Sequence, residues 1–129
     1  MSQIFLDTNI FARYLVGDIA PQKLEAKEIF DSIYQGKNTG VVSILVIDEL
    51  IWVLENYYNY ERKDYLPKVI KLFTFKEIRV LEIKKEIIMD IFESMLESKV
   101  DFTDYYLMKV SKGRKIVSFD KDFGKLFGK

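Results

Sequence analysis

Short runs of β-branched and aliphatic residues alternate with longer segments of helical periodicity along most of this chain. Strands that are joined by helices in this way form a parallel sheet covered by those helices. We therefore expect an α/β fold. The 129 residues contain no internal repeat, no low-complexity tract and no Pro- or Gly-rich linker. We expect a single domain over residues 1–129.

Hydrophobic period and capping residues place the expected elements. Strands are expected at residues 2–6, 38–43, 78–83 and 115–119. Helices are expected at residues 8–16, 21–36, 44–58, 61–75, 84–98 and 101–113, with a short helical turn at 121–127. Ser43 is a good N-cap for the helix that follows it, and Pro67 is a candidate break in its helix. The helix at 44–58 is apolar on almost all sides, which predicts a central position.

Cysteine and histidine are both absent from the chain. Their absence excludes a disulfide, a thiol nucleophile, a histidine base and a Cys/His zinc site. An enzyme built from this chain has to use carboxylates, hydroxyls, lysines or a metal that prefers oxygen ligands, such as magnesium or manganese. No apolar run approaches the roughly 20 residues of a membrane span, and the N-terminus does not resemble a signal peptide. We expect a cytoplasmic protein.

The net charge is zero, but the charges are unevenly distributed. Residues 105–129 contain seven basic and two acidic residues and carry a net charge of +5, so the rest of the chain carries −5. A basic C-terminal quarter is able to attract phosphates. The alternative is a solvated helix face with a lysine-rich tail, and charge alone favours that alternative.

Two aspartates stand where an α/β sheet places its ligands. Asp7 follows the first expected strand and Asp120 follows the last one, and ligands gather at the carboxyl ends of parallel strands. Each acid also has a structural explanation. Asp7 is a good N-cap, Asp101 and Asp104 suit the first turn of a helix, and Asp120 suits a turn.

Glu49 is harder to explain structurally. Its helical neighbours are Leu45, Val46, Trp52 and Val53. These neighbours predict that the carboxylate is buried, which is costly unless a cation lies nearby. Asp48 has similarly apolar neighbours, so position alone does not choose between the two acids. A bound metal or a distant lysine or arginine are the candidate cations.

Three segments in order resemble the PIN-domain family, and most closely its VapC-type ribonuclease toxins. They are "IFLDTNIFARYL", "VVSILVIDELIWVLENYY" and "DFTDYYLMKVSKGRKIVSFDKDF". The likeness covers nearly the whole chain, although residues 55–85 carry no motif. It implies a three-layer α/β/α sandwich around a short parallel sheet.

The resemblance also implies a site. It assigns the catalytic and metal-binding acids to Asp7, Glu49, Asp104 and Asp120, with Asp101 as an additional metal ligand. It assigns supporting polar roles to Thr8, Asn9 and Ser118. Tyr105 departs from the small residue that is usual at its position, and we expect it to crowd the pocket. Converging carboxylates repel one another, and Mg²⁺ or Mn²⁺ relieves that repulsion and activates water for hydrolysis.

The implied function is a metal-dependent endoribonuclease that acts as the toxin of a type II toxin–antitoxin pair. RNA would be its substrate, an antitoxin protein its partner and a homodimer its assembly, with Lys112, Arg114 and Lys115 binding phosphates. Residues 55–65 and the pair Phe73 and Phe75 are candidate partner surfaces or, equally, helix-packing residues. The alternatives are a housekeeping RNA-processing nuclease of the same fold and a non-catalytic module that binds RNA or protein.

Overall fold

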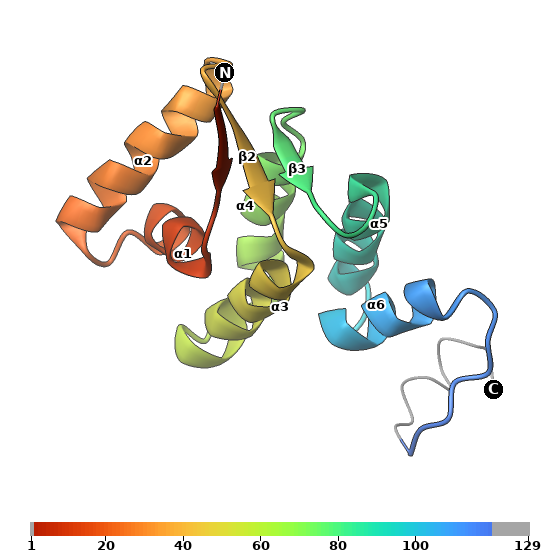
Figure 1. The fold of residues 1–129 in the computed structure, drawn as a ribbon. Coiled ribbons are helices and arrows are strands. Elements are labelled where there is room, and N and C mark those ends of the chain that lie inside the picture. The colour runs from red at the N-terminus through yellow and green to blue at the C-terminus, as the bar shows by residue number, and fades with distance from the viewer. Residues whose placement is uncertain (1, 120–129) are drawn as a thin grey trace.

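The computed structural model describes residues 2–119, which form an α/β fold around a three-stranded parallel sheet (Figure 1). The elements in chain order are β1 (Ser2–Phe5), α1 (Thr8–Val16), α2 (Ala20–Tyr34), β2 (Asn38–Val42), α3 (Ile44–Trp52), the π-helix η1 (Val53–Tyr57), α4 (Arg62–Phe73), β3 (Ile78–Val80), α5 (Lys85–Leu96) and α6 (Phe102–Ser111). The predicted α/β class with a short parallel sheet is confirmed.

The strands lie in the order β1-β2-β3, and both neighbouring pairs are parallel. Gly40 sits in the middle of the central strand β2, paired with Ile4 on one side and Ile78 on the other. A Cβ atom at Gly40 would lie 2.8 Å from Leu6 Cδ1 and 2.9 Å from Ile33 Cδ1. Glycine is therefore what allows helix α2 and strand β1 to pack closely on this strand.

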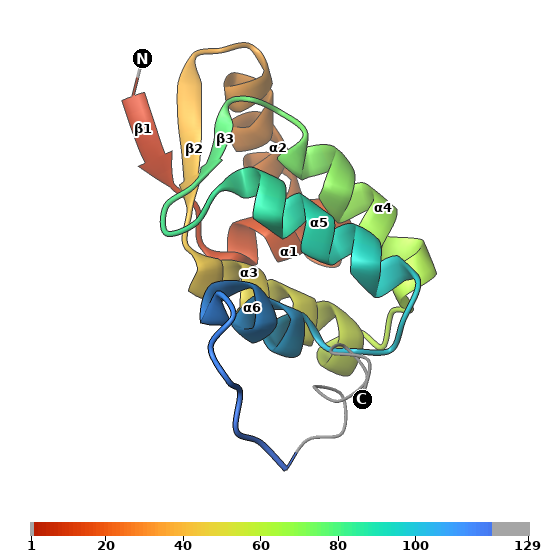
Figure 2. The same ribbon diagram turned by 90° about the vertical axis from the view of Figure 1, so that its right-hand side faces the viewer.

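The helices that follow the strands cover one face of the sheet. Leu6, Val42 and Ile78 are buried on that face, and Figure 2 shows α2, α4 and α5 on the same side of the strands. The side chains of Gln3, Phe5 and Arg79 lie on the opposite face of the sheet, and no described element buries them. Helices α3 and α6 lie together near the carboxyl ends of the strands (Figures 1 and 2).

A chain of aromatic rings runs through the core and connects the helices. Phe11 of α1 packs on Phe30 of α2 and on Phe73 of α4, with ring centroids 5.4 and 5.9 Å apart. Phe73 then contacts Phe92 of α5 at 5.6 Å, and Phe92 contacts Phe102 of α6 at 6.0 Å. Each such ring pair contributes about 1 kcal/mol of stability beyond the burial of its apolar area. The aromatic chain thus reaches from the first helix to the last.

Several local predictions are confirmed. Helix α1 covers the predicted residues 8–16 and ends at Gly17, which has a φ of 70°. Ser43 is the N-cap of α3, and its hydroxyl accepts a hydrogen bond from Leu45 N. The break predicted at Pro67 is wrong, however, since helix α4 passes through this residue without interruption. The buried side chains of Leu66 and Val69 on either side hold this turn in the core.

Other local predictions are wrong. Strand β3 ends at Val80 instead of residue 83. Leu81 N still donates to Val42 O, but the Glu82 carboxylate then turns to the start of α3. Phe73 is fully buried in the core, and Phe75 packs on Tyr34 with ring centroids 4.0 Å apart. Of the two alternatives given for the Phe73 and Phe75 pair, these contacts support helix packing.

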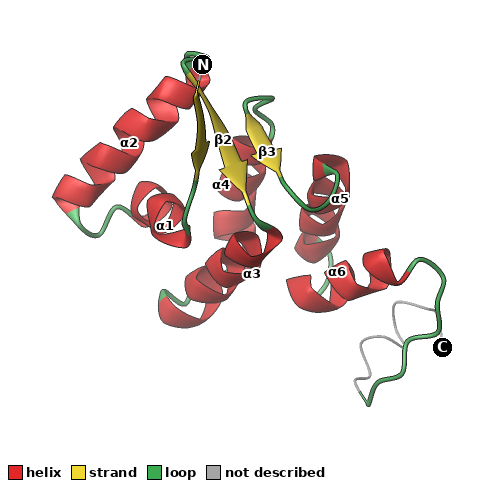
Figure 3. Cartoon of the chain, viewed as in Figure 1, coloured by secondary structure: helices red, strands yellow, loops and turns green. Residues whose placement is uncertain are grey.

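The strand predicted at residues 115–119 is also absent. Residues 114–118 have no regular structure, and Figure 3 shows the chain after α6 as loop. A strand requires a neighbouring strand for its hydrogen bonds, and none of the described strands pairs with this segment. Val117 and Phe119 are accordingly exposed. The helical turn predicted at 121–127 lies outside the described residues.

The sequence predicts no membrane span. Among residues 2–119, no helix is both long enough and apolar enough to cross a bilayer.

Arg62, the first residue of α4, ties the second half of the chain to the first. Its guanidinium donates to the carbonyl oxygens of Ser98 and Val100, at 2.9 and 2.8 Å, and its Nε donates to Glu55 Oε2 at 2.9 Å. The side chain is only 17% exposed. These carbonyls lie in the segment between α5 and α6, where no backbone N–H of the described helices and strands donates to them. Arg62 therefore fixes the path of the chain from α5 into α6.

We expect Arg62→Met to lower the free energy of unfolding by about 3 kcal/mol, because it leaves the carbonyls of Ser98 and Val100 without this donor and removes the cation beside the Glu55 carboxylate. Urea unfolding followed by circular dichroism measures the change. Lys63→Met is the matched control, since Lys63 is the exposed neighbour and its ion pair with Glu61 lies at the surface. Equal stabilities of the two variants would contradict the role of Arg62.

Candidate functional site

Asp7 lies at the carboxyl end of β1, immediately before helix α1. It occupies the N-cap position with extended backbone (φ −88°, ψ 163°), and its carbonyl oxygen accepts from Ile10 N. Its carboxylate, however, forms no capping hydrogen bond and is exposed. The capping explanation for Asp7 therefore does not describe its side chain.

Thr8 and Asn9 continue the polar segment in the first turn of α1. Thr8 is 4% exposed, and its Oγ1 atom has no hydrogen-bond partner among the described residues. A buried hydroxyl without a partner costs about 1 to 3 kcal/mol. Asn9 is exposed. The N-terminus of α1 thus combines an exposed carboxylate that does not cap the helix with a buried hydroxyl that has no hydrogen-bond partner among the described residues.

Glu49 is exposed on α3, and the prediction that it is buried is wrong. Its neighbours Leu45 and Trp52 are themselves 74% and 62% exposed. Ile47, Leu50 and Ile51 form the buried side of the helix instead. None of the described elements covers the Leu45–Glu49–Trp52 side, so Glu49 needs no cation to offset burial.

Helix α6 brings two further acids beside α3. Asp101 is the N-cap residue of the helix but makes no side-chain capping bond, and its Oδ1 lies 3.5 Å from Arg62 Nη2. Asp104 is half-buried in the first turn. Between them, Thr103 Oγ1 donates to Asp48 Oδ1 at 2.8 Å. This bond joins α3 to α6, so Asp48 serves as a link between the helices.

Tyr105 does not crowd a pocket, contrary to the prediction. Its ring is 7% exposed, and its hydroxyl lies 2.7 Å from Ser98 Oγ and 3.4 Å from Ser94 O. The side chain is therefore held against α5 and the segment that follows it. It acts as core packing that supports α6.

The remaining predicted site residues lie after α6. Lys112, Arg114, Lys115 and Ser118 are exposed, and the Arg114 guanidinium donates to Ser111 O at 3.3 Å. Asp120 lies outside the described residues. Within residues 2–119 no three acidic side chains are close enough to hold a metal ion together. The oxygen donors and the unsatisfied Thr8 hydroxyl nevertheless fit the chemistry of a hard cation such as Mg²⁺.

Glu82 belongs to the same edge of the sheet and was not predicted. Its carboxylate accepts from Ser43 Oγ at 2.6 Å and from Ile44 N at 2.8 Å, and so caps α3 from 38 residues away. Burial alone would raise the pKa of Glu82, but these two hydrogen bonds, together with one from its own backbone, outweigh it and lower the pKa. The carboxylate stays ionised and holds α3 in place at the end of β2. No local motif marks this role, because the partner is distant in sequence.

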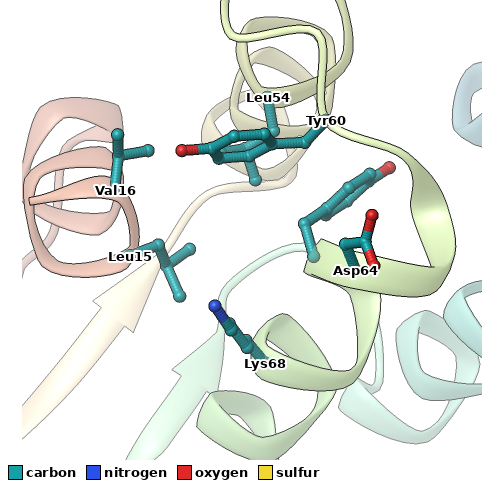
Figure 4. Close-up of a pocket in the computed structure, with 7 residues that line it drawn as sticks. Leu15, Val16, Leu54, Tyr60, Asp64 and Lys68 are labelled. Atoms are coloured by element: carbon teal, nitrogen blue, oxygen red, sulfur yellow. The ribbon is translucent and has the colours of Figure 1, made fainter.

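A separate hollow of about 260 Å³ lies at the opposite end of α1 from Asp7. Figure 4 shows Leu15, Val16 and Tyr60 around it, with the Lys68 ammonium group pointing toward Leu15. None of the predicted site residues lines this hollow. The candidate site is therefore the carboxyl edge of the sheet, where Asp7 follows β1 and α3 follows β2.

The model of the PIN domain family matches residues 4–128. The chain belongs to the PIN domain family. No curated protein sequence and no solved structure matches the chain. PIN domains are generally nucleases, which are hydrolases, and they typically use divalent metals. The acids at the carboxyl edge of this PIN domain are thus the candidates for that chemistry.

We expect Asp7→Ala to change the free energy of unfolding by less than about 0.5 kcal/mol, since no capping bond is lost. Ser43→Ala is the matched comparison at the next strand end, where a capping bond is present, and it should cost about 1 kcal/mol. Urea unfolding in the presence of a chelator measures both variants. A loss for Asp7→Ala as large as that for Ser43→Ala would assign Asp7 a structural role.

Proposed function

We propose that this PIN domain is a metal-dependent endoribonuclease that hydrolyses RNA phosphodiester bonds. The observation that carries the proposal is the Asp7 carboxylate, which is exposed at the carboxyl end of β1 and is not used as a helix cap. Family membership supports a nuclease, and the absence of histidine and cysteine restricts the chemistry to oxygen ligands.

Asp7, Glu49, Asp104 and Asp120 are the proposed ligands of Mg²⁺ or Mn²⁺, with Asp101 as an additional one. The bound ion would supply a Lewis acid that activates water and neutralises charge developing on the phosphate. Thr8, Asn9 and Ser118 would orient the acids or a water on the bound ion by hydrogen bonds. Glu82 would keep the start of α3, and therefore Glu49, in position through its bonds to Ser43 and Ile44.

Lys112, Arg114 and Lys115 are the proposed contacts to the RNA backbone. They follow α6 directly and are exposed, in the quarter of the chain that carries the excess of positive charge. Basic side chains beside an acidic site would hold the phosphates while the acids hold the metal. Binding and chemistry would then rest on different residues.

We further propose that the protein is the toxin of a type II toxin–antitoxin pair. The support is the resemblance of its three motifs to VapC-type toxins. A cytoplasmic homodimer and a bound antitoxin protein belong to this proposal. In residues 55–65, Tyr57 is 70% exposed and Tyr60 is 40% exposed, and exposed tyrosines are frequent at protein interfaces.

Cleavage of total RNA should stop when divalent cations are chelated and return when manganese or magnesium is added in excess. Zinc should not be required, since the chain offers no Cys or His ligand. Mapping the new RNA ends measures the activity. Asp7→Asn should lose nearly all cleavage, whereas Asp90→Asn, at an exposed position on α5, should keep it. Full activity in excess chelator would exclude the metal.

Replacing Lys112, Arg114 and Lys115 with alanine should weaken RNA binding to a similar extent for all sequences. The slope of log affinity against log salt should fall by about 0.7 for each lost single-strand phosphate contact. Fluorescence anisotropy of a labelled RNA in chelator measures this. Asp7→Asn should bind as the parent does. Unchanged binding by the triple variant would place the RNA on another surface.

A further inference from the structure

Trp52 is the only tryptophan of the chain, and it is 62% exposed on α3. Single exposed apolar residues are common on protein surfaces, but Trp52 is not isolated. It lines a hollow of about 270 Å³ between α3, η1 and the start of α6. An aromatic ring that forms one wall of an open hollow is available to stack on a planar ligand.

The other walls of the hollow are fixed and rich in oxygen acceptors. Asp48, Asn56 and Asp101 all line it. Asp48 Oδ1 accepts from Thr103, and Asn56 Nδ2 donates to Trp52 O at 3.1 Å, so both side chains are held in place. Asp101 Oδ1 lies 3.5 Å from Arg62, although the side chain is 73% exposed. One oxygen of each carboxylate is left to accept from a ligand.

An aromatic ring beside carboxylates favours the binding of a nucleobase and disfavours the binding of a phosphate group. Carboxylates repel phosphate groups, but they accept hydrogen bonds from the exocyclic amino groups of bases, as Asp and Glu do from cytosine N4. Unpaired RNA bases stack on aromatic side chains. We propose that the hollow beside Trp52 binds one unpaired nucleobase that carries an exocyclic amino group, that is adenine, cytosine or guanine before uracil.

The hollow adjoins the candidate site, so the proposal rests on the proposed ribonuclease function. Trp52 follows Glu49 by three residues, a rise of about 4.5 Å along the helix, and Asp101 contributes to both places. A base held there would belong to a nucleotide close to the bond that is cut. Trp52 would then determine which sequences are cleaved, as a specificity residue without a part in the chemistry.

The fluorescence of Trp52 reports on this binding directly, because no other tryptophan contributes. Short single-stranded RNA homopolymers of adenosine, cytidine or uridine are titrated into the full chain in the presence of a chelator, so that no cleavage occurs. The adenosine and cytidine polymers should quench the emission and bind about tenfold more tightly than the uridine polymer. Equal effects of all three, or no effect of any, would overturn the proposal.

Two variants sharpen the test, with anisotropy of the labelled polymers as the readout. Trp52→Leu should weaken binding of the adenosine polymer by about five- to hundredfold, the range expected for one lost base stack. Leu24→Ala, at a residue 60% exposed on α2, should change nothing. Asp48→Asn keeps an oxygen for Thr103 but removes the charge, and it should reduce the preference for adenosine and cytidine over uridine.

The outcomes separate this proposal from the proposed function. Quenching by the adenosine polymer in a protein that cuts no RNA with any metal would support the base site and reject the nuclease. A parent and a Trp52→Leu variant that cut total RNA at the same sequences would support the nuclease and reject the base site. Emission that changes with protein concentration, and not with RNA, would assign the hollow to contacts between copies and would also overturn the proposal.

Discussion

The guanidinium of Arg62 is the contact on which the arrangement of the second half of the molecule depends. The aromatic rings from Phe11 to Phe102 supply burial, but burial is non-directional and does not fix how a helix starts. Arg62 adds direction, because its planar donors meet the carbonyls of Ser98 and Val100 and the carboxylate of Glu55 at the same time. The start of α6, and with it Asp101 and Asp104, takes its position from those bonds.

The carboxyl edge of the sheet is held by a second set of distant polar contacts. Glu82, after β3, caps α3, and Asp48 on α3 binds Thr103 on α6. Each contact spans more than 35 residues of sequence. Asp7 and Thr8 are the exceptions at this edge, since the carboxylate caps nothing and the buried hydroxyl has no described partner. Places where a fold leaves polar groups unsatisfied are where function is expected.

Local sequence patterns predicted those features of the fold that interactions between neighbouring residues determine. The bounds of α1, the cap at Ser43 and the parallel sheet follow from apolar period, capping preference and the alternation of elements. The errors have a common cause. The burial of Glu49 and a strand at 115–119 both depend on which distant element lies alongside, and apolar period carries no information on that. Family resemblance named the acids, but it did not name Glu82 or Arg62, which lie in the stretch without motifs.

The shape of α3 explains how one helix serves both the core and the candidate site. Leu50 and Leu54 are buried on one side, while Glu49 and Trp52 are exposed on the other. After Trp52 the helix widens into the π-helix η1, and an inserted residue of this kind rotates the side chains that follow. Glu55 is thereby brought to Arg62 and to the hydroxyl of Tyr65, instead of continuing the exposed stripe. Burial and the bond to Glu55 raise the pKa of Tyr65, so the phenol stays protonated and donates. The π-helix thus ties the end of this helix, through Glu55, to the contact that positions α6. Glu49, Trp52 and the acids of α6 consequently share one rigid support.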